Sequence, residues 1–295
     1  MATGETITSS LADSLETIIA AARAVREYEG VMQRLAQVHQ LEENTGLSWR
    51  EITYAKLTAS SVSETQRVWN PQQFSDSAFA LTPTMTVIHT FVSDRVKRRL
   101  NQKALAKMGS LAQKAIERKK DIDGITLLDG ATNSQPGAGN ALTSGVIAAA
   151  ATNIRSNATE PSEGVIRCVM HGFQRKDLYD ELTAGLGTYP VPEGVTARVF
   201  TNGFAGRIDT VEIFIDDNIA IDSSSDAKGG VFAQEGCLLV QGKKPWTETR
   251  REPDIGGGGE SIWHYDEYIW GERLAANTTS AWIWEILSDA TAPTS

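Results

Sequence analysis

Residues 81–120 decide the fold, and they read LTPTMTVIHTFVSDRVKRRLNQKALAKMGSLAQKAIERKK. The first part alternates between threonines and apolar side chains, as the two faces of a strand do. From Ser93 onward the period becomes helical, with an apolar stripe of Val96, Leu100, Ala104, Met108, Leu111 and Ala115. Ser93 can cap this helix and Asp94 complements its dipole. The stretch therefore predicts a strand that runs directly into a helix over 93–120, about 42 Å long.

The charge of this helix sets it apart from the rest of the chain. Between Asp94 and Asp121 there are ten Lys/Arg and three Asp/Glu residues, a net charge of +7. Because the whole chain carries −9, the remainder carries −16. The helix lacks aromatic side chains and spreads its charges over several faces, which is not typical of a helix that reads a DNA groove. A solvated face, a nucleic-acid contact and a contact with an acidic protein surface all stay open.

A long two-stranded arm is predicted upstream, over 47–92. Its second strand contains Pro83, which indicates an edge or a bulge because proline cannot donate to a ladder. One face of that strand is apolar and comprises Phe79, Leu81, Met85, Val87 and Phe91. The first strand, 49–57, has a weaker pattern, and the polar, turn-rich residues 59–78 form the tip. A hairpin this long can hardly bury its apolar face in its own domain, so we expect it to lie on something else.

The remaining segments predict a helix before the arm and a compact α+β region after the basic helix. Residues 9–41 have one apolar stripe and predict a helix that Gly30 weakens. A helix over 141–156, a strand over 165–170 and a helix ending near Gly185 follow the basic helix. Adjacent apolar runs predict three strand pairs: 211–215 with 219–221, 231–232 with 238–240, and 262–270 with 281–287.

Composition excludes several classes of protein. Hydrophobic residues make up 41% and charged residues 22% of the 295 residues, which excludes a disordered tail. No run approaches the ~20 apolar residues that a membrane helix needs, and residues 1–16 lack a secretory signal pattern. We therefore expect the chain to fold in a cytoplasm without a membrane contact. Cys168 and Cys237 each lie in an apolar run and are expected to be buried thiols.

The sequence contains no pattern that indicates catalysis. The histidines, His39, His89, His171 and His264, are scattered and do not have the spacing of metal ligands. A dinucleotide fingerprint, a phosphate loop and a nucleophile elbow are all missing. We therefore predict that the chain is not an enzyme and has no catalytic residue, metal or cofactor.

Four stretches and their order carry a resemblance to a known family. They are LTPTMTVIHTFVSDRVKRRLNQKALAKMGSLAQKAIERKKDIDGITLLDG (81–130), VIRCVMHGFQRKDLYDEL (165–182), GRIDTVEIFIDDNIAI (206–221) and GGVFAQEGCLLVQGKKPWTETRREP (229–253). In this order, over nearly the whole chain, they resemble the major capsid proteins of tailed bacteriophages with the Hong Kong 97 fold. The resemblance implies an α+β fold. Its parts are an N-terminal arm (1–46), an extended E-loop (47–92), the spine helix and peripheral domain (93–135), an axial domain (136–240), and strands that return to the peripheral domain (241–295).

The same resemblance implies a structural function. Copies of the chain would form hexamers and pentamers that close into an icosahedral shell around double-stranded DNA, bound without sequence specificity. The E-loop would lie across a neighbouring subunit and the N-terminal arm would reach another. Scaffolding, portal and decoration proteins are the further partners it implies. The location is the virion capsid, assembled in the cytoplasm of the bacterial host. Because no long charged segment precedes the arm, we expect a separate scaffolding protein or none.

Six residues are the candidates for contacts between subunits. Arg50, Arg67 and Trp69 lie on the predicted arm, where exposed Arg and Trp favour interfaces. Lys97, Arg98 and Arg99 begin the basic helix, and we expect them to bind an acidic surface of another subunit rather than DNA. Two other functions remain open. One is an encapsulin-like nanocompartment shell, which shares the fold. The other is a DNA-binding protein that acts through residues 95–120.

Overall fold

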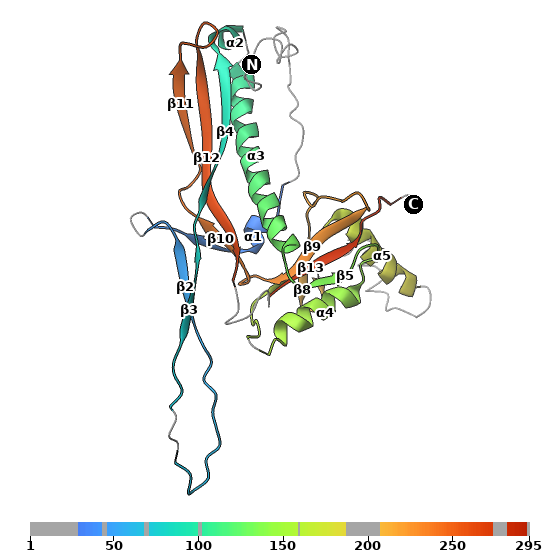
Figure 1. Cartoon of the computed structure of the whole chain (residues 1–295). Helices are drawn as coiled ribbons and strands as arrows, with labels where there is room; N and C mark the ends of the chain where they lie inside the picture. Colours follow the sequence, from blue (N-terminus) through green and yellow to red (C-terminus); the bar gives the residue numbers. More distant parts are fainter. Residues whose placement is uncertain are drawn as a thin grey trace.

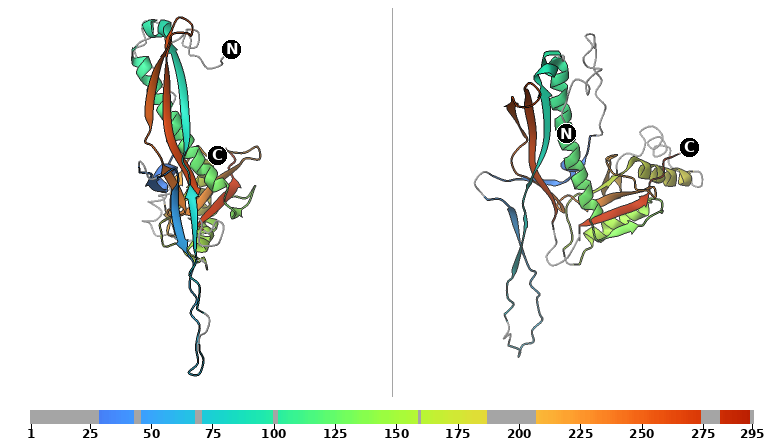
Figure 2. Two further views of the ribbon diagram at one scale, coloured as in Figure 1. Left: turned by 60° about the vertical axis from the view of Figure 1, so that its left-hand side comes forward. Right: turned by 45° about the horizontal axis from the view of Figure 1, so that its top comes forward.

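The computed structural model describes residues 29–42, 46–67, 71–99, 102–158, 160–186, 207–273 and 282–293. Two β-sheets are joined by one long helix, and a thin two-stranded hairpin extends away from both (Figure 1). Turning the molecule shows the same elongated sheet and projecting hairpin from other sides (Figure 2). In the part of the chain that the structure describes, no helix is long and apolar enough to cross a membrane.

The first sheet is built around one long strand, β12 (Gly259–Glu272). On one side β12 pairs antiparallel with β4 along ten residues. On its other side it pairs with β11 and then with β10, and β1 adds to β10 in parallel. The partner strands are β1 (Gln37–Gln40), β4 (Thr84–Ser93), β10 (Cys237–Gln241) and β11 (Trp246–Glu252).

Two helices follow β4, where the sequence predicts a single helix over 93–120. They are α2 (Asp94–Arg99) and α3 (Gln102–Asp129). Ser93 caps α2, because its Oγ accepts a hydrogen bond from the Val96 amide at 3.3 Å. Helix α3 continues nine residues beyond the predicted end at Lys120. Its buried stripe also differs from the prediction: Ala112 and Ile116 are buried while Leu111 is exposed. The described helical residues belong to two helices, α2 and α3, so a stripe counted from Val96 of α2 does not keep its phase in α3.

The second sheet has six strands in the order β5-β13-β9-β6-β8-β7. Helices α4 and α5 pack on one face, where Ile147, Ile154 and Leu178 meet Cys168 and Met170 of the sheet. The end of α3 and the short helix α1 cover the other face, through Leu128 and Met32. The elements of this part are α1 (Met32–Leu35), β5 (Ser134–Pro136), α4 (Ser144–Arg155), β6 (Ile166–Met170), α5 (Gly172–Leu186), β7 (Arg207–Ile208), β8 (Val211–Ile215), β9 (Asp226–Ala233) and β13 (Ile283–Asp289). The predicted helix 141–156 and strand 165–170 are confirmed.

The prediction of one helix over 9–41 is wrong for the residues that the structure describes. Within them the helix spans only Met32–Leu35, and Ala36 turns the backbone into the extended conformation. Residues 37–40 then form β1, because β10 offers a free edge to their backbone groups. Residues 9–28 of the predicted helix lie outside the described residues. Tertiary pairing overrides helix propensity here.

The three predicted strand pairs are also wrong. Strand β8 pairs with β6 and β7, whereas residues 219–221 contribute only a bridge from Ile221 to Ala227. Strands β9 and β10 belong to different sheets, so the turn between them carries the chain from one sheet to the other. Strand β13 pairs with β9 and β5, not with β12. In each case strands close in sequence are separated by partners from distant segments, which periodicity does not reveal.

A buried ion pair fixes α3 to the first sheet. Lys120 Nζ lies 2.5 Å from Asp266 Oδ2, and both side chains are almost fully buried. The same ammonium group donates to Gln241 Oε1 at 2.8 Å and lies over the Tyr268 ring, 4.7 Å from its centroid. The Trp270 indole donates to the Lys120 carbonyl at 2.7 Å. All the partners come from β10 and β12, so this turn of α3 cannot slide along the sheet without leaving charges unpaired.

We expect Lys120→Met to lower the free energy of unfolding by about 3–5 kcal/mol, because Asp266 would remain buried without a cation. The double variant Lys120→Met/Asp266→Leu should recover part of this loss, since it removes both charges. The matched control is Lys119→Met, one residue away, whose exposed pair with Asp123 should contribute less than about 1 kcal/mol. Urea unfolding of unassembled subunits measures all three. Equal losses for the Lys119 and Lys120 variants would contradict the assignment.

Candidate inter-subunit surfaces

The projecting hairpin consists of β2 (Trp49–Tyr54) and β3 (Asp76–Leu81). The strands pair antiparallel from Trp49 opposite Leu81 to Tyr54 opposite Asp76. At the outer end of β2, Tyr54 stacks on Phe74, with ring centroids 5.0 Å apart. The described residues of the connection between the strands are almost all exposed. Pro83 interrupts the predicted second strand: β3 ends before it, β4 starts after it, and the pairing partner changes from β2 to β12.

The base of the hairpin is held firmly to the body. Arg273, after β12, donates to Glu51 Oε2 at 2.8 Å, to Gln37 Oε1 at 3.1 Å and to the Glu235 carbonyl at 3.2 Å. His39 of β1 stacks on Trp49 of β2, with ring centroids 4.6 Å apart. A side chain at Gly271 would collide with Leu81, so the hairpin root packs directly against the β12 backbone. The hairpin therefore leaves the body in a defined direction.

Large apolar side chains on the hairpin are exposed in the single chain. Tyr54 and Phe74 are 57% and 62% exposed, and Ile52 and Leu57 are similarly open. Contiguous exposed apolar surface of this kind marks interaction sites. The prediction that the arm requires something to lie on is consistent with this exposure.

A second surface with exposed apolar side chains is the face of the first sheet that points away from α3. Asp266 points to α3, so its neighbour Tyr265 points the opposite way, as do the residues that pair with it, Val87 and Trp246. Tyr265 stacks on Trp246 at 5.0 Å, and Lys243 Nζ lies 4.1 Å from the Trp246 ring centroid. This row crosses three strands on one face.

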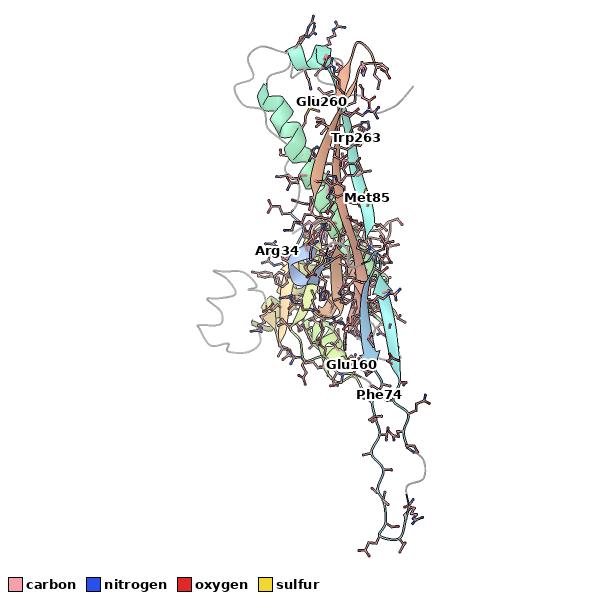
Figure 3. All side chains as sticks on the ribbon, turned by 90° about the vertical axis from the view of Figure 1, so that its left-hand side faces the viewer. Arg34, Phe74, Met85, Glu160, Glu260 and Trp263 are labelled. Carbon is pink, nitrogen blue, oxygen red and sulfur yellow. The ribbon has the colours of Figure 1, made fainter. Side chains whose placement is uncertain are left out.

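A parallel row lies beside it, where Trp263 stacks on His89 at 4.7 Å. Met85 and Val87 of β4 are 60% and 50% exposed on the same face. Figure 3 shows Met85 and Trp263 along the sheet, with Phe74 further down at the start of the hairpin connection. We call Met85, Val87, His89, Trp246, Trp263 and Tyr265 the outer face. The sequence predicts the alternation in β4 but not which of its two faces α3 covers. In the structure the face that carries the threonines lies against the helix.

The five candidate contact residues that the structure describes lie in two places that the fold does not bring together. Arg50 and Arg67 are exposed on the hairpin, and Trp69 lies outside the described residues. Lys97, Arg98 and Arg99 are on α2, at the far end of the first sheet (Figure 1). Lys97 forms an ion pair with Glu260 of β12, whereas Arg98 and Arg99 are exposed. These five residues therefore belong to two separate surfaces.

Charge at the α2 end is arranged around Asp94. Its carboxylate accepts from Arg251 of β11, with Arg251 Nη2 at 2.7 Å from Oδ2. The hydrogen bond from Arg251 lowers the pKa of Asp94, and the nearby charges of Arg251, Arg98 and Lys97 act in the same direction. This end of the sheet thus keeps its carboxylate ionised and presents further arginines to solvent.

Site chemistry of other kinds is limited among the described residues. Within them no group of three or more His, Cys, Asp or Glu side chains could hold a metal ion. Cys168 and Cys237 are buried and free, as predicted. Burial raises the pKa of both thiols well above the usual range, which makes them poor nucleophiles.

No protein-family model matches the chain, and no curated protein matches its sequence. Solved structures match it over nearly its whole length. A structure of Mycobacterium phage Che8 has a TM-score of 0.70 at 14% identity, with 94% of this chain and 97% of that chain covered. The capsid of cyanophage P-SCSP1u gives 0.68 at 11% identity, with 97% and 96% covered. The capsid asymmetric unit of cyanophage Pam1 gives 0.68 at 11%, with 99% and 100% covered.

The chain therefore has the fold of tailed-phage capsid proteins. It is an α+β fold of the Hong Kong 97 type, and the fold that the sequence resemblance predicts is confirmed. The match covers almost all of each partner chain, so the likeness extends to the whole architecture rather than to one sheet. Identity to these three structures is only 11–14%, which explains why sequence comparison alone finds no match.

We expect Arg273→Met to loosen the hairpin without unfolding the body, because Glu51 and the Glu235 carbonyl would lose their donor. The loss should be about 1–3 kcal/mol, confined to the hairpin. Hydrogen exchange of peptides covering 49–54 and 76–81 should accelerate, while a peptide covering 166–170 should not change. Arg50→Met is the matched control, since Arg50 is exposed and points to the opposite side of β2 from Glu51. Acceleration by both variants would argue against the anchor.

Proposed function

We propose that the chain is the major capsid protein of a tailed bacteriophage, a shell subunit without catalytic function. The observation that carries the proposal is the near-complete match to phage capsid structures. The exposed surfaces support it independently. A hairpin and a sheet face that both expose aromatic and apolar side chains are costly in a solitary protein, and burial against further copies would stabilise them.

The parts of the chain then take definite roles in a shell. The hairpin acts as the extended loop that crosses a neighbouring copy, α3 as the spine, and the second sheet with α4 and α5 as the centre of hexamers and pentamers. The domain boundaries given by the sequence resemblance stay predictions. Double-stranded DNA without sequence preference, and scaffolding, portal and decoration proteins, complete the set of proposed partners. Assembly takes place in the cytoplasm of the bacterial host.

The basic residues favour a protein contact over a DNA contact. Three lysines of the basic stretch, Lys97, Lys119 and Lys120, are already paired with acidic side chains of the same chain. This pairing reduces the charge available to phosphates, which argues against a DNA-binding protein that acts through residues 95–120. An inter-subunit contact at α2 then rests on Arg98 and Arg99. An encapsulin-like shell is the second candidate, because it shares the fold. A phage capsid would enclose DNA, whereas a nanocompartment would enclose a protein cargo.

Electron microscopy of the purified chain tests the proposal first. We expect negative-stain images and sedimentation velocity to show closed shells, or free hexamers and pentamers, because the exposed apolar surfaces need partners. The nucleic acid content of shells purified from infected cells separates a capsid from a nanocompartment. A monodisperse monomer or dimer, unchanged by crowding agents or a candidate scaffold, would contradict a shell function.

We expect Val87→Lys to abolish or strongly reduce assembly, by about tenfold or more, because an unpaired ammonium group would be buried at the outer face. The free subunit should keep its melting temperature, since Val87 is half exposed there. Thr249→Lys is the matched control. It adds the same charge to an exposed position of β11 in the same sheet, on the side that faces away from the outer face. Unchanged shell yield for Val87→Lys would exclude the outer face from the interface.

A further inference from the structure

Two aspartate side chains accept hydrogen bonds from the backbone just before and at the start of α1. Asp216, after β8, accepts from the Val31 amide at 3.0 Å, and Asp121 of α3 accepts from the Met32 amide at 3.0 Å. Both aspartates are buried. A side chain at Gly30 would collide with the Asp121 carboxyl group, so the backbone can approach only because a glycine stands there.

Asn218 bridges the two carboxyl groups. Its backbone amide donates to Asp216 Oδ1 at 3.0 Å and its side-chain amide donates to Asp121 Oδ2 at 2.9 Å. Two buried carboxyl groups that share one bridging residue repel each other when both are charged, so a proton on one of them favours the arrangement.

The surroundings of the pair favour that proton. Burial raises the pKa of Asp216 to about 7, the amides of Val31 and Asn218 oppose the shift, and the Asp121 carboxyl group adds to it. The positively charged side chains of the adjoining elements lie against other acidic groups and not against this pair. Lys120 of α3 pairs with Asp266, Lys228 of β9 pairs with Asp129, and His171 after β6 faces Asp217 at 3.9 Å.

We propose that Asp121 and Asp216 form a proton-dependent latch that holds the N-terminal segment of the chain at Gly30–Met32. With a proton on Asp216, the pair accepts the Val31 and Met32 amides and carries a single negative charge. After that proton leaves, two negative charges lie buried in contact, and the hold on the segment weakens. The latch acts within one chain, so it does not depend on the chain forming a shell.

The direction of the pH dependence follows from the raised pKa. When the segment is released and water enters, Asp216 returns toward its ordinary value of 3.8. Between that value and about 7 the latched state binds one more proton than the released state. Rising pH therefore weakens the latch throughout this window, and above about 7 the loss is complete and constant.

Hydrogen exchange of the full chain, corrected for the intrinsic pH dependence of exchange, tests the latch. For a peptide covering 30–36, protection should fall by about tenfold or more between about pH 5.5 and about pH 8. Asp216→Asn keeps one acceptor oxygen, for the Val31 or the Asn218 amide, and removes the charge, so its protection should change by less than about twofold over the same range. If the first variant does not fold, Asp121→Asn removes the neighbouring charge but leaves Asp216 buried, so its loss of protection should be smaller than that of the wild type. The control Asp254→Asn, in the exposed loop before β12, should behave as the wild type does.

Three results would overturn the latch. One is wild-type protection that does not depend on pH. The second is an unaltered pH dependence in both Asp121→Asn and Asp216→Asn. The third is an equal loss of protection in a peptide of α4 (Ser144–Arg155), which would show that the whole subunit opens. Shell formation is not a readout in any of these measurements, so they are independent of the test of the capsid function.

Discussion

One turn of α3 fixes the positions of the other parts of the molecule. Lys120 faces the first sheet, where Asp266 and Gln241 receive its ammonium group. The next residue, Asp121, faces the backbone at Met32 and the amide of Asn218. Two turns later Leu128 packs into the second sheet. Because a buried charge without its partner costs several kcal/mol, adjacent polar residues with different partners set both the rotation and the axial position of the helix. The two sheets and the N-terminal segment take their places from that helix.

The structure separates what stabilises the subunit from what the subunit presents. One hydrophobic cluster lies under α4 and α5 in the second sheet, and the other lies between the second sheet, α1, the end of α3 and the nearby ends of β10 and β12. Phe232, Leu128 and Ile283 are fully buried there. The far part of the first sheet is only two layers thick, a sheet with one helix, and its outer face carries stacked, partly exposed aromatic rings. A single sheet face of this kind gains little from its own chain. Its side chains are those that stabilise contacts between proteins, since aromatic residues are enriched at the energetic centres of interfaces.

Local patterns in the sequence predict the elements better than their partners. The strand-to-helix stretch 81–120, helix α4 and strand β6 follow from periodicity and capping. The pairing of β13 with β9, and the assignment of β9 and β10 to different sheets, do not follow, because they depend on contacts between distant segments. Periodicity also predicts two faces for β4 without saying which one α3 covers. The threonine face is the covered one, and the candidate contacts Met85 and Val87 emerge only from the exposed fraction of their side chains. Arg50, Arg98 and Arg99 are exposed, as a contact between subunits requires.

The charge asymmetry in the sequence has a different meaning in the folded chain. A net charge of +7 over residues 94–121 predicts a strongly basic rod. In the fold, Lys97 and Lys120 are paired with Glu260 and Asp266, acidic residues of a strand more than 140 positions away. Part of the basic charge therefore binds the helices to the acidic sheet of the same subunit, where partial burial protects it from salt screening. The exposed remainder, which includes Arg98 and Arg99 at the α2 end, lies far from the hairpin. If both surfaces bind neighbouring copies, contacts at the α2 end should be the more sensitive to salt and contacts at the apolar hairpin the less sensitive.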